Sequence, residues 1–148
     1  MVDGCSSKVE SMSRSNFENL TIYKLAEALA DQVWTIVVDW EPFARDTVGG
    51  QLVRAADSIG ANIAEGVGRW GLKDQKRFIY IARGSLNETK HWLRRCFRRK
   101  LLSEQQIDTL KPILEELPPK LNAYINSLGG KKRDLPPSAS DDPSSEDE

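Results

Sequence analysis

The sequence is poor in the residues that build metal sites and disulfide frameworks. It has one histidine and two cysteines among 148 residues. A zinc site needs about four nitrogen, sulfur or oxygen ligands, and Cys5 and Cys96 are too few and too scattered for a disulfide framework. We therefore predict free thiols, no metal and no other cofactor.

Long apolar runs are absent as well. No run approaches the roughly 18 residues that a membrane-spanning helix needs, and the first residues lack the apolar segment of a secretory signal. The sequence therefore predicts no membrane association. Together with free thiols, these absences indicate a protein of the cytoplasm, where thiols stay reduced.

Both ends of the sequence are polar. Residues 134–148 contain six acidic residues and no basic one. Segments rich in serine, proline and acid bury too little apolar surface to fold. We expect a disordered leader over residues 1–16, one folded domain over 17–130, and a disordered acidic tail over 131–148.

Apolar residues recur at helical spacing through the domain. We expect three helices, over about 19–40, 46–65 and 73–100, with Asn19 and Asp46 as N-caps. Three glycines between the second and third helices are expected to form a turn that uses positive φ angles. The expected buried stripe of the third helix comprises Phe78, Ile81, Ala82, Ser85, Leu86, Thr89, Trp92, Leu93 and Cys96.

A fourth apolar stripe runs from Ile107 to Leu128. Ser103 and Gln106, just before it, have the spacing of a capping box. Prolines at positions 112, 118 and 119 lie inside the stripe, yet its helical phase holds across them. The pattern therefore predicts one helix with a kink near Leu117.

Four amphipathic helices with short connections predict an all-α fold, an antiparallel up-down-up-down four-helix bundle. Two of the helices have more apolar surface than one core needs, and a second apolar face is typical of a partner contact. We therefore predict a homo-oligomer, although neighbouring helices can also cover such residues. The predicted interface residues are Tyr23, Trp34, Val38, Ile79 and Phe97.

The net charge of −1 hides a strong asymmetry. Residues 69–100 contain eleven basic and two acidic residues, a net charge of +9. On a helical wheel most of these cations share one arc, which no acidic residue enters. Phosphates recur along nucleic acid, and binding them releases counterions, so this arc predicts a nucleic-acid-binding surface. Its residues are Lys73, Lys76, Arg77, Tyr80, Arg83, Lys90, Arg94, Arg95 and Arg98.

Two other interpretations of the basic arc stay open. The arc can pair with protein acid, either the outward face of the first helix, with Glu27, Asp31 and Asp39, or the acidic tail. Complementary charged faces fix the register of an interface and suppress wrong docking. The arc can also be a solvated helix face with no partner.

The sequence has little that supports catalysis. Glu88 and His91 have the spacing of di-iron bundle ligands, but such sites need two pairs of this kind. Ser85 and Cys96 face the expected core with no second histidine to activate them. The glycines after the second helix lack the ending of a phosphate-binding loop. We therefore predict that the protein is not an enzyme.

Two motifs carry a family resemblance. The segment Asn62-Ile63-Ala64-Glu65-Gly66-Val67-Gly68-Arg69, followed by Ile81-Ala82-Arg83-Gly84-Ser85-Leu86-Asn87-Glu88, resembles the bacterial four-helix bundle proteins encoded in intervening sequences of 23S ribosomal RNA genes. The resemblance covers roughly residues 17–128. The matching residues, which we interpret as structural, are Asn62, Glu65, Gly66, Gly68, Arg69, Gly84, Ser85 and Glu88.

The resemblance implies a ring-like homopentamer. It also implies kinship with the accessory variability determinant of diversity-generating retroelements, whose members are basic pentamers that bind nucleic acid and a reverse transcriptase. We therefore expect a non-enzymatic homo-oligomer that binds RNA or DNA through the third helix. The alternative is an interaction scaffold, for example for a reverse transcriptase, in which the basic arc contacts protein.

Overall fold

A computed structural model describes residue 17 and residues 20–130. The leader, the tail and the predicted N-cap Asn19 lie outside the described residues. Within the described part of the chain every regular element is a helix. The elements are α2 (Thr21–Val38), α3 (Pro42–Ala44), the π-helix η2 (Arg45–Gly49), α4 (Gly50–Val67), α5 (Leu72–Arg98) and α6 (Glu104–Gly130).

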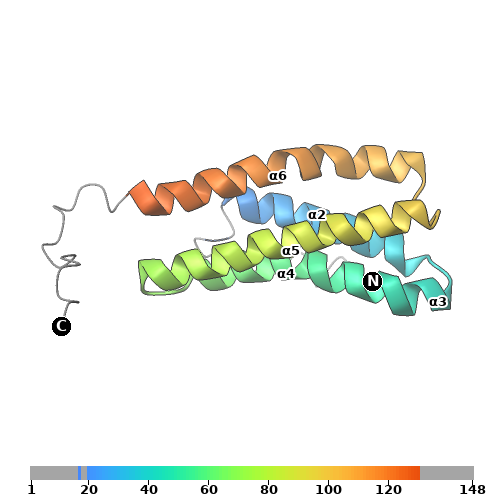
Figure 1. The fold of residues 1–148 in the computed structure, drawn as a ribbon, viewed down its shortest axis with the longest axis horizontal. Coiled ribbons are helices and arrows are strands. Elements are labelled where there is room, and N and C mark those ends of the chain that lie inside the picture. Colours follow the sequence, from blue (N-terminus) through green and yellow to red (C-terminus); the bar gives the residue numbers. More distant parts are fainter. Residues whose placement is uncertain (1–16, 18–19, 131–148) are drawn as a thin grey trace, which may run out of the picture.

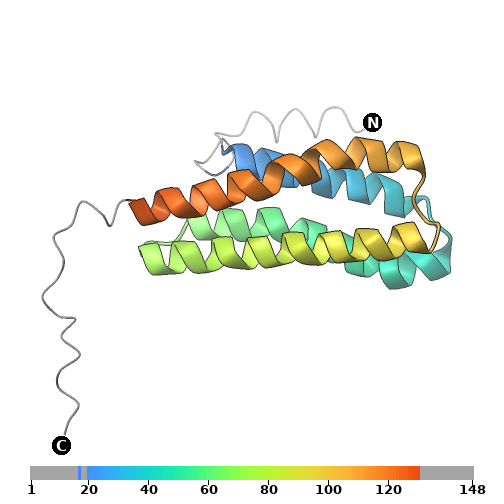
Figure 2. The ribbon, with the colours of Figure 1, turned by 45° about the horizontal axis from the view of Figure 1, so that its top comes forward.

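The four long helices lie side by side in a bundle (Figures 1 and 2). α4 contacts α2 and α5, and α6 also contacts α2 and α5, so that α2 lies diagonally opposite α5. The α4–α5 connection is at one end of the bundle, and the α2–α3 and α5–α6 connections are at the other (Figure 1). Fully buried side chains from all four helices form one core: Leu29, Val33, Leu52, Ile59, Ile63, Ile79, Leu86, Cys96, Leu110, Leu117 and Leu121.

The second predicted helix begins earlier than expected. Helical structure starts at Pro42, because proline is well suited to the first helical position, where no N–H donor is needed. Asp46 is not an N-cap, and its carboxylate instead accepts a hydrogen bond from Arg45 Nε at 3.3 Å. At Gly49, a Cβ atom would lie 2.7 Å from Val37 Cγ1, so glycine allows η2 to pack closely against α2.

The buried face of α5 differs from the prediction at two isoleucines. Ile79, expected on an outward apolar face, is fully buried in the core, and Ile81, expected in the core, is 44% exposed. A Cβ atom at Gly66 of α4 would lie 3.3 Å from Ile79 Cδ1 and 3.1 Å from the Gln75 carbonyl oxygen. The absent side chain of Gly66 thus makes the room that Ile79 fills.

α6 confirms the predicted capping box and the single helix. The Gln106 backbone N–H donates to Ser103 Oγ at 3.1 Å, and the Ser103 backbone N–H donates to Gln106 Oε1 at 3.0 Å. The helix continues through Pro112, Pro118 and Pro119 to Gly130. Burial of one apolar stripe on the other helices offsets the cost of these interior prolines.

The turns do not use glycine as expected. No glycine among the described residues has a positive φ, and Gly68 ends α4 with φ −77°. The one left-handed residue in that part of the chain is Lys100, with φ 61°, directly after α5. Among the helices described here, none combines the length and apolar character needed to cross a membrane.

Candidate nucleic-acid interface

All nine residues of the predicted nucleic-acid-binding surface lie on α5, and we call this set the basic face. These residues lie together because their spacing in the sequence places them on one side of a 27-residue helix. Lys76 and Arg95 are half-buried, and the other seven are exposed. At 1.5 Å per residue, the basic face is about 38 Å long.

Few groups within the chain neutralise the basic face. Arg77 Nε lies 3.7 Å from Asp74 Oδ1, in an exposed pair of the kind that contributes little stability. Arg83 Nη1 donates to the amide oxygen of Asn122 on α6 at 3.3 Å, which leaves its charge in place. In the part of the chain described here, no carboxylate pairs with any of the other cations of the basic face.

Aromatic surface is interleaved with these cations. Tyr80 is 46% exposed, and the Arg83 guanidinium lies 4.8 Å from the centre of its ring. A hollow of about 630 Å³ beside Tyr80 is lined by the apolar side chains of Leu72 and Ile81, by lysine and arginine, and by the acidic residue Asp74. Cations around an aromatic surface can hold phosphates while a base stacks.

Acidic residues gather on the far side of the bundle. Glu27 and Asp31 are exposed on α2, and Asp39 is exposed at its C-cap, diagonally opposite the basic face. Partial burial raises the pKa of Asp57 on α4, and the nearby charge of Asp31 raises it further. None of these carboxylates forms an ion pair with a cation of the basic face in the described part of the chain.

The predicted interface residues fall into three groups. Trp34 is 58% exposed and Val38 is half exposed, and both border a hollow between α2 and the start of α4. Phe97 is half exposed over a groove of about 260 Å³ between α5 and α6. Tyr23 is half-buried with its ring edge on Phe17, and the fifth residue is the buried Ile79 described above.

The first motif holds α4 against α5. The Asn62 side-chain amide donates to the carbonyl oxygen and to Oγ of Ser58, at 2.8 and 2.9 Å. Ser58 Oγ is in turn hydrogen-bonded to Ser85 Oγ of α5 at 3.0 Å. Asn62 therefore organises a polar contact between the helices and does not cap the end of α4.

Charged residues of both motifs make local contacts. Arg69 donates to Glu65 Oε1 at 2.6 Å and lies over the ring of Phe78. Glu88 Oε1 accepts from the indole Nε1–H of Trp92 at 3.2 Å, and the His91 and Trp92 rings form a T-shaped pair with centres 4.7 Å apart. Across the described residues there is no cluster of three metal-ligating side chains.

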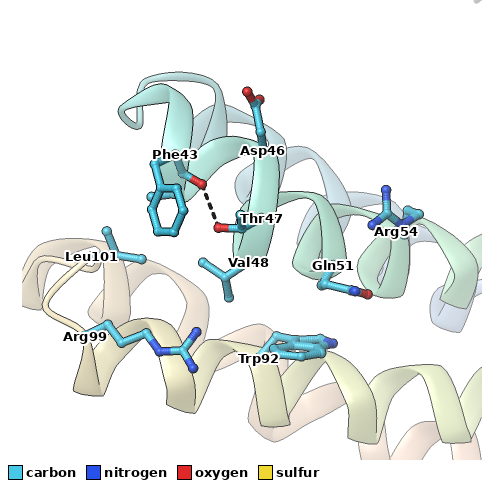
Figure 3. A pocket seen from close by; sticks show the side chains of 10 residues that line it. Phe43, Asp46, Thr47, Val48, Gln51, Arg54, Trp92, Arg99 and Leu101 are labelled. Atoms are coloured by element: carbon cyan, nitrogen blue, oxygen red, sulfur yellow. Dashed lines mark hydrogen bonds between the residues drawn. The ribbon is translucent and has the colours of Figure 1, made fainter.

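Sequence reasoning missed a second group of cations. Arg54 of α4 and Arg99 after α5 line one hollow with Phe43 and Trp92 (Figure 3). Spacing along the chain gave no signal for this group, because only the fold brings the segments around residues 43–54 and 92–101 together.

Comparisons with known proteins agree with this architecture. A family model described as 23S rRNA-intervening sequence protein matches residues 18–123. A crystal structure of a protein of unknown function from the S23 ribosomal protein family of Bacteroides thetaiotaomicron VPI-5482 superposes with a TM-score of 0.63 at 22% identity. The match covers 71% of this chain and 98% of that one. A search of curated protein sequences found no match.

Proposed function

The chain belongs to the 23S rRNA-intervening sequence protein family, and from the surface that its fold exposes we propose that it is a non-enzymatic accessory protein that binds RNA or DNA through the basic face. The observation that carries the proposal is the exposed row of cations on α5. Among the residues that the structure describes, Arg77 is the only one of these cations that forms an ion pair with a carboxylate. Like charges one turn apart, such as Arg94 and Arg98, oppose helix formation slightly. A polyanion that contacts them removes this repulsion and releases counterions.

We further propose that the bundle is an antiparallel up-down-up-down unit of a homo-oligomer, with a pentamer as the expected form. The alternating ends of the helix connections and the exposed Trp34, Val38 and Phe97 support this assembly. Light scattering coupled to size-exclusion chromatography should give about five times the chain mass of 16.6 kDa. A monomer at micromolar concentration would contradict the proposal.

Fluorescence anisotropy with a labelled single-stranded RNA tests the binding function. We expect affinity to fall steeply with salt, with a slope of about −0.7 per phosphate contacted, and to depend little on sequence. Arg94→Glu should weaken binding several-fold to about tenfold and make the salt slope shallower by about one contact. No binding by the wild-type protein at low salt would reject the proposed function.

Lys24→Glu is the matched control. Lys24 is exposed on α2, diagonally opposite the basic face, and the same charge reversal is made in a helix interior. If binding depended on net charge alone, Lys24→Glu and Arg94→Glu would weaken it equally. If the basic face is the site, only Arg94→Glu has the full effect.

The alternative is a scaffold in which the basic face contacts protein. The unpaired carboxylates on α2 and α4, where Asp31 raises the pKa of Asp57, favour it, because they form an acidic surface of the kind a second copy could present. Reversal of both Arg94 and Arg98 to glutamate separates the two functions. Loss of RNA binding by an intact oligomer supports the first, and dissociation of the oligomer supports the second.

A further inference from the structure

An open hollow of about 740 Å³ lies at the end of the bundle where η2 and the first turn of α4 face the end of α5 (Figure 3). Pockets of roughly 300–1,000 Å³ are typical of sites for small ligands. One wall is formed by η2, and π-helical turns recur at functional sites. No residue of the hollow belongs to the basic face.

Some polar side chains around the hollow already have hydrogen-bond partners among the described residues, and others have none. Thr47 Oγ1 donates to the Phe43 carbonyl oxygen at 2.6 Å, and Asp46 accepts from Arg45. In the described part of the chain no hydrogen bond or ion pair engages the side chains of Arg54, Gln51 or Arg99. Two guanidinium groups and one side-chain amide are therefore available to bind a ligand.

Aromatic faces complete the hollow. The Phe43 side chain is 82% exposed, although large apolar side chains normally avoid water. Trp92 lies on the opposite wall, with Gln51 above its ring and Arg99 and Arg54 on either side (Figure 3). The Trp92 indole N–H is already engaged by Glu88, so this half-buried ring lines the hollow without a free donor.

We infer that this hollow binds an unpaired nucleobase together with an adjoining phosphate. An exposed aromatic ring such as that of Phe43 can stack on any base. A glutamine amide both donates to and accepts from a base edge, and an arginine guanidinium can bind two phosphate oxygens at once. A carboxylate of an acidic peptide would satisfy the arginines but leave the exposed Phe43 ring and Gln51 without a matching group. The combination therefore favours a nucleotide.

The inference rests on the proposed function, because it places one base of a bound strand. Arg95 is one turn along α5 from Trp92, and Arg98 directly precedes Arg99. A strand whose phosphates follow the basic face thus reaches the hollow where α5 ends. The basic face supplies contacts independent of sequence, and the hollow holds one base out of the stack.

The first experiment compares a single-stranded oligonucleotide with an abasic oligonucleotide of the same length and charge, by anisotropy on the full chain. We expect Phe43→Ala to weaken binding of the base-containing strand about tenfold and to leave the abasic strand unchanged, since one stacked base contributes about 1–3 kcal/mol. Trp70→Ala is the control, because Trp70 is a fully exposed aromatic residue between α4 and α5, at the other end of the bundle. An unchanged preference in Phe43→Ala overturns the inference.

The second experiment tests the hollow without the basic face. Adenosine monophosphate is titrated into the protein while the indole N–H resonance of Trp92 is followed by NMR, assigned with Trp92→Phe. We expect a saturable shift that Arg54→Gln weakens several-fold and that inorganic phosphate does not reproduce. No shift, an equal shift with phosphate, or displacement by an acidic peptide overturns the inference.

Different results would reject strand binding by the basic face and nucleotide binding by the hollow. If RNA does not bind but adenosine monophosphate shifts Trp92, the proposed strand-binding function fails and the nucleotide site stands. If Phe43→Ala changes the mass of the oligomer, the hollow is a contact between copies of the chain, and the nucleotide site is rejected.

Discussion

At the scale of single residues, two glycines have opposite surroundings. At Gly66 a Cβ atom would lie 3.1 Å from both the Gln75 carbonyl oxygen and Phe78 Cβ, whereas at Gly84 it would meet no atom within 4 Å. Gly84 lies inside α5, where glycine costs roughly 0.5–1 kcal/mol relative to alanine. The two positions therefore respond differently to the same change.

Gly84→Ala should raise the free energy of unfolding by about 0.5–1 kcal/mol, because it lowers the chain entropy of the unfolded state and introduces no clash. Gly66→Ala should lower it by about 1 kcal/mol or more, because α4 and α5 must separate slightly. Urea denaturation of both variants measures the difference. Stabilisation by Gly66→Ala would show that the contact relaxes without cost.

A further prediction concerns Cys96. Burial raises the pKa of this thiol from 9.0 to about 11, although the nearby charge of Arg99 lowers it. Because the folded-state pKa is the higher one, the stability that the buried thiol contributes is present below about pH 9 and is lost between about pH 9 and 11.

In a Cys5→Ser background, we expect labelling of Cys96 by a thiol reagent at pH 8 to be at least a hundredfold slower in the native protein than in urea. The free energy of unfolding should fall between pH 9 and 11, and less so in Cys96→Ala. Rapid labelling of the native protein would show that α5 opens locally.

The isoleucines of α5 show a limit of helical-wheel reasoning. Ile79 and Ile81 flank the buried stripe on opposite sides, so periodicity alone does not choose between them. The choice is made by Gly66, which leaves room for Ile79 beside α4. A sequence pattern indicates which side of a helix is buried, but the exact boundary depends on which neighbours provide space.

At the scale of elements, the capping box of α6 is the interaction that sequence spacing predicts best. Its two hydrogen bonds depend only on residues three positions apart. The cap gives partners to backbone N–H groups at the start of α6 that have none within the helix. The start of α6 is therefore a point where a single side chain has a measurable effect.

Ser103→Ala should lower the free energy of unfolding by about 1 kcal/mol, because the Gln106 backbone N–H loses its partner. Ser127→Ala is the same change near the other end of α6, where the hydroxyl only donates to the Tyr124 carbonyl oxygen of its own helix. We expect Ser127→Ala to change stability by less than about 0.5 kcal/mol. Equal effects of the two variants, measured by urea denaturation, would contradict the capping role.

The beginning of the second long helix was harder to predict. The sequence indicated a start at Asp46, but the chain forms α3 and η2 from Pro42 onward. The wide turn of η2 is possible because Gly49 allows close contact with Val37 of α2. This is a tertiary requirement, and local preferences for caps do not contain it.

At the scale of the whole molecule, the sequence predicted four helices and the basic face but not the hollow beside Trp92. The basic face lies on one helix, so the spacing of its residues in the chain fixes their arrangement. The hollow combines Phe43 and Arg54 with Trp92 and Arg99, and their approach depends on how α4 packs against α5. A site that spans two elements needs the fold before it can be recognised.

The charges of the whole chain give one more prediction. Residues 134–148 contain six acidic residues that can compete with nucleic acid for the basic face. A chain ending at Arg133 should bind single-stranded RNA several-fold more tightly at low salt, and the difference should vanish at about 0.5 M salt. A full-length control with asparagine or glutamine at the six positions should behave like the truncated chain. If truncation leaves the anisotropy titration unchanged, the tail does not screen the basic face.

The prolines of α6 have a consequence for how the bundle opens. Each one removes a backbone hydrogen bond from the helix, so residues 120–130 depend on the burial of Leu121, Ile125 and Leu128 for their contact with the other helices. We therefore expect this last segment to open before the rest of α6 and to exchange its amide protons faster, which hydrogen exchange measures. Its opening would expose buried apolar side chains of α2 while α4 and α5 stay paired.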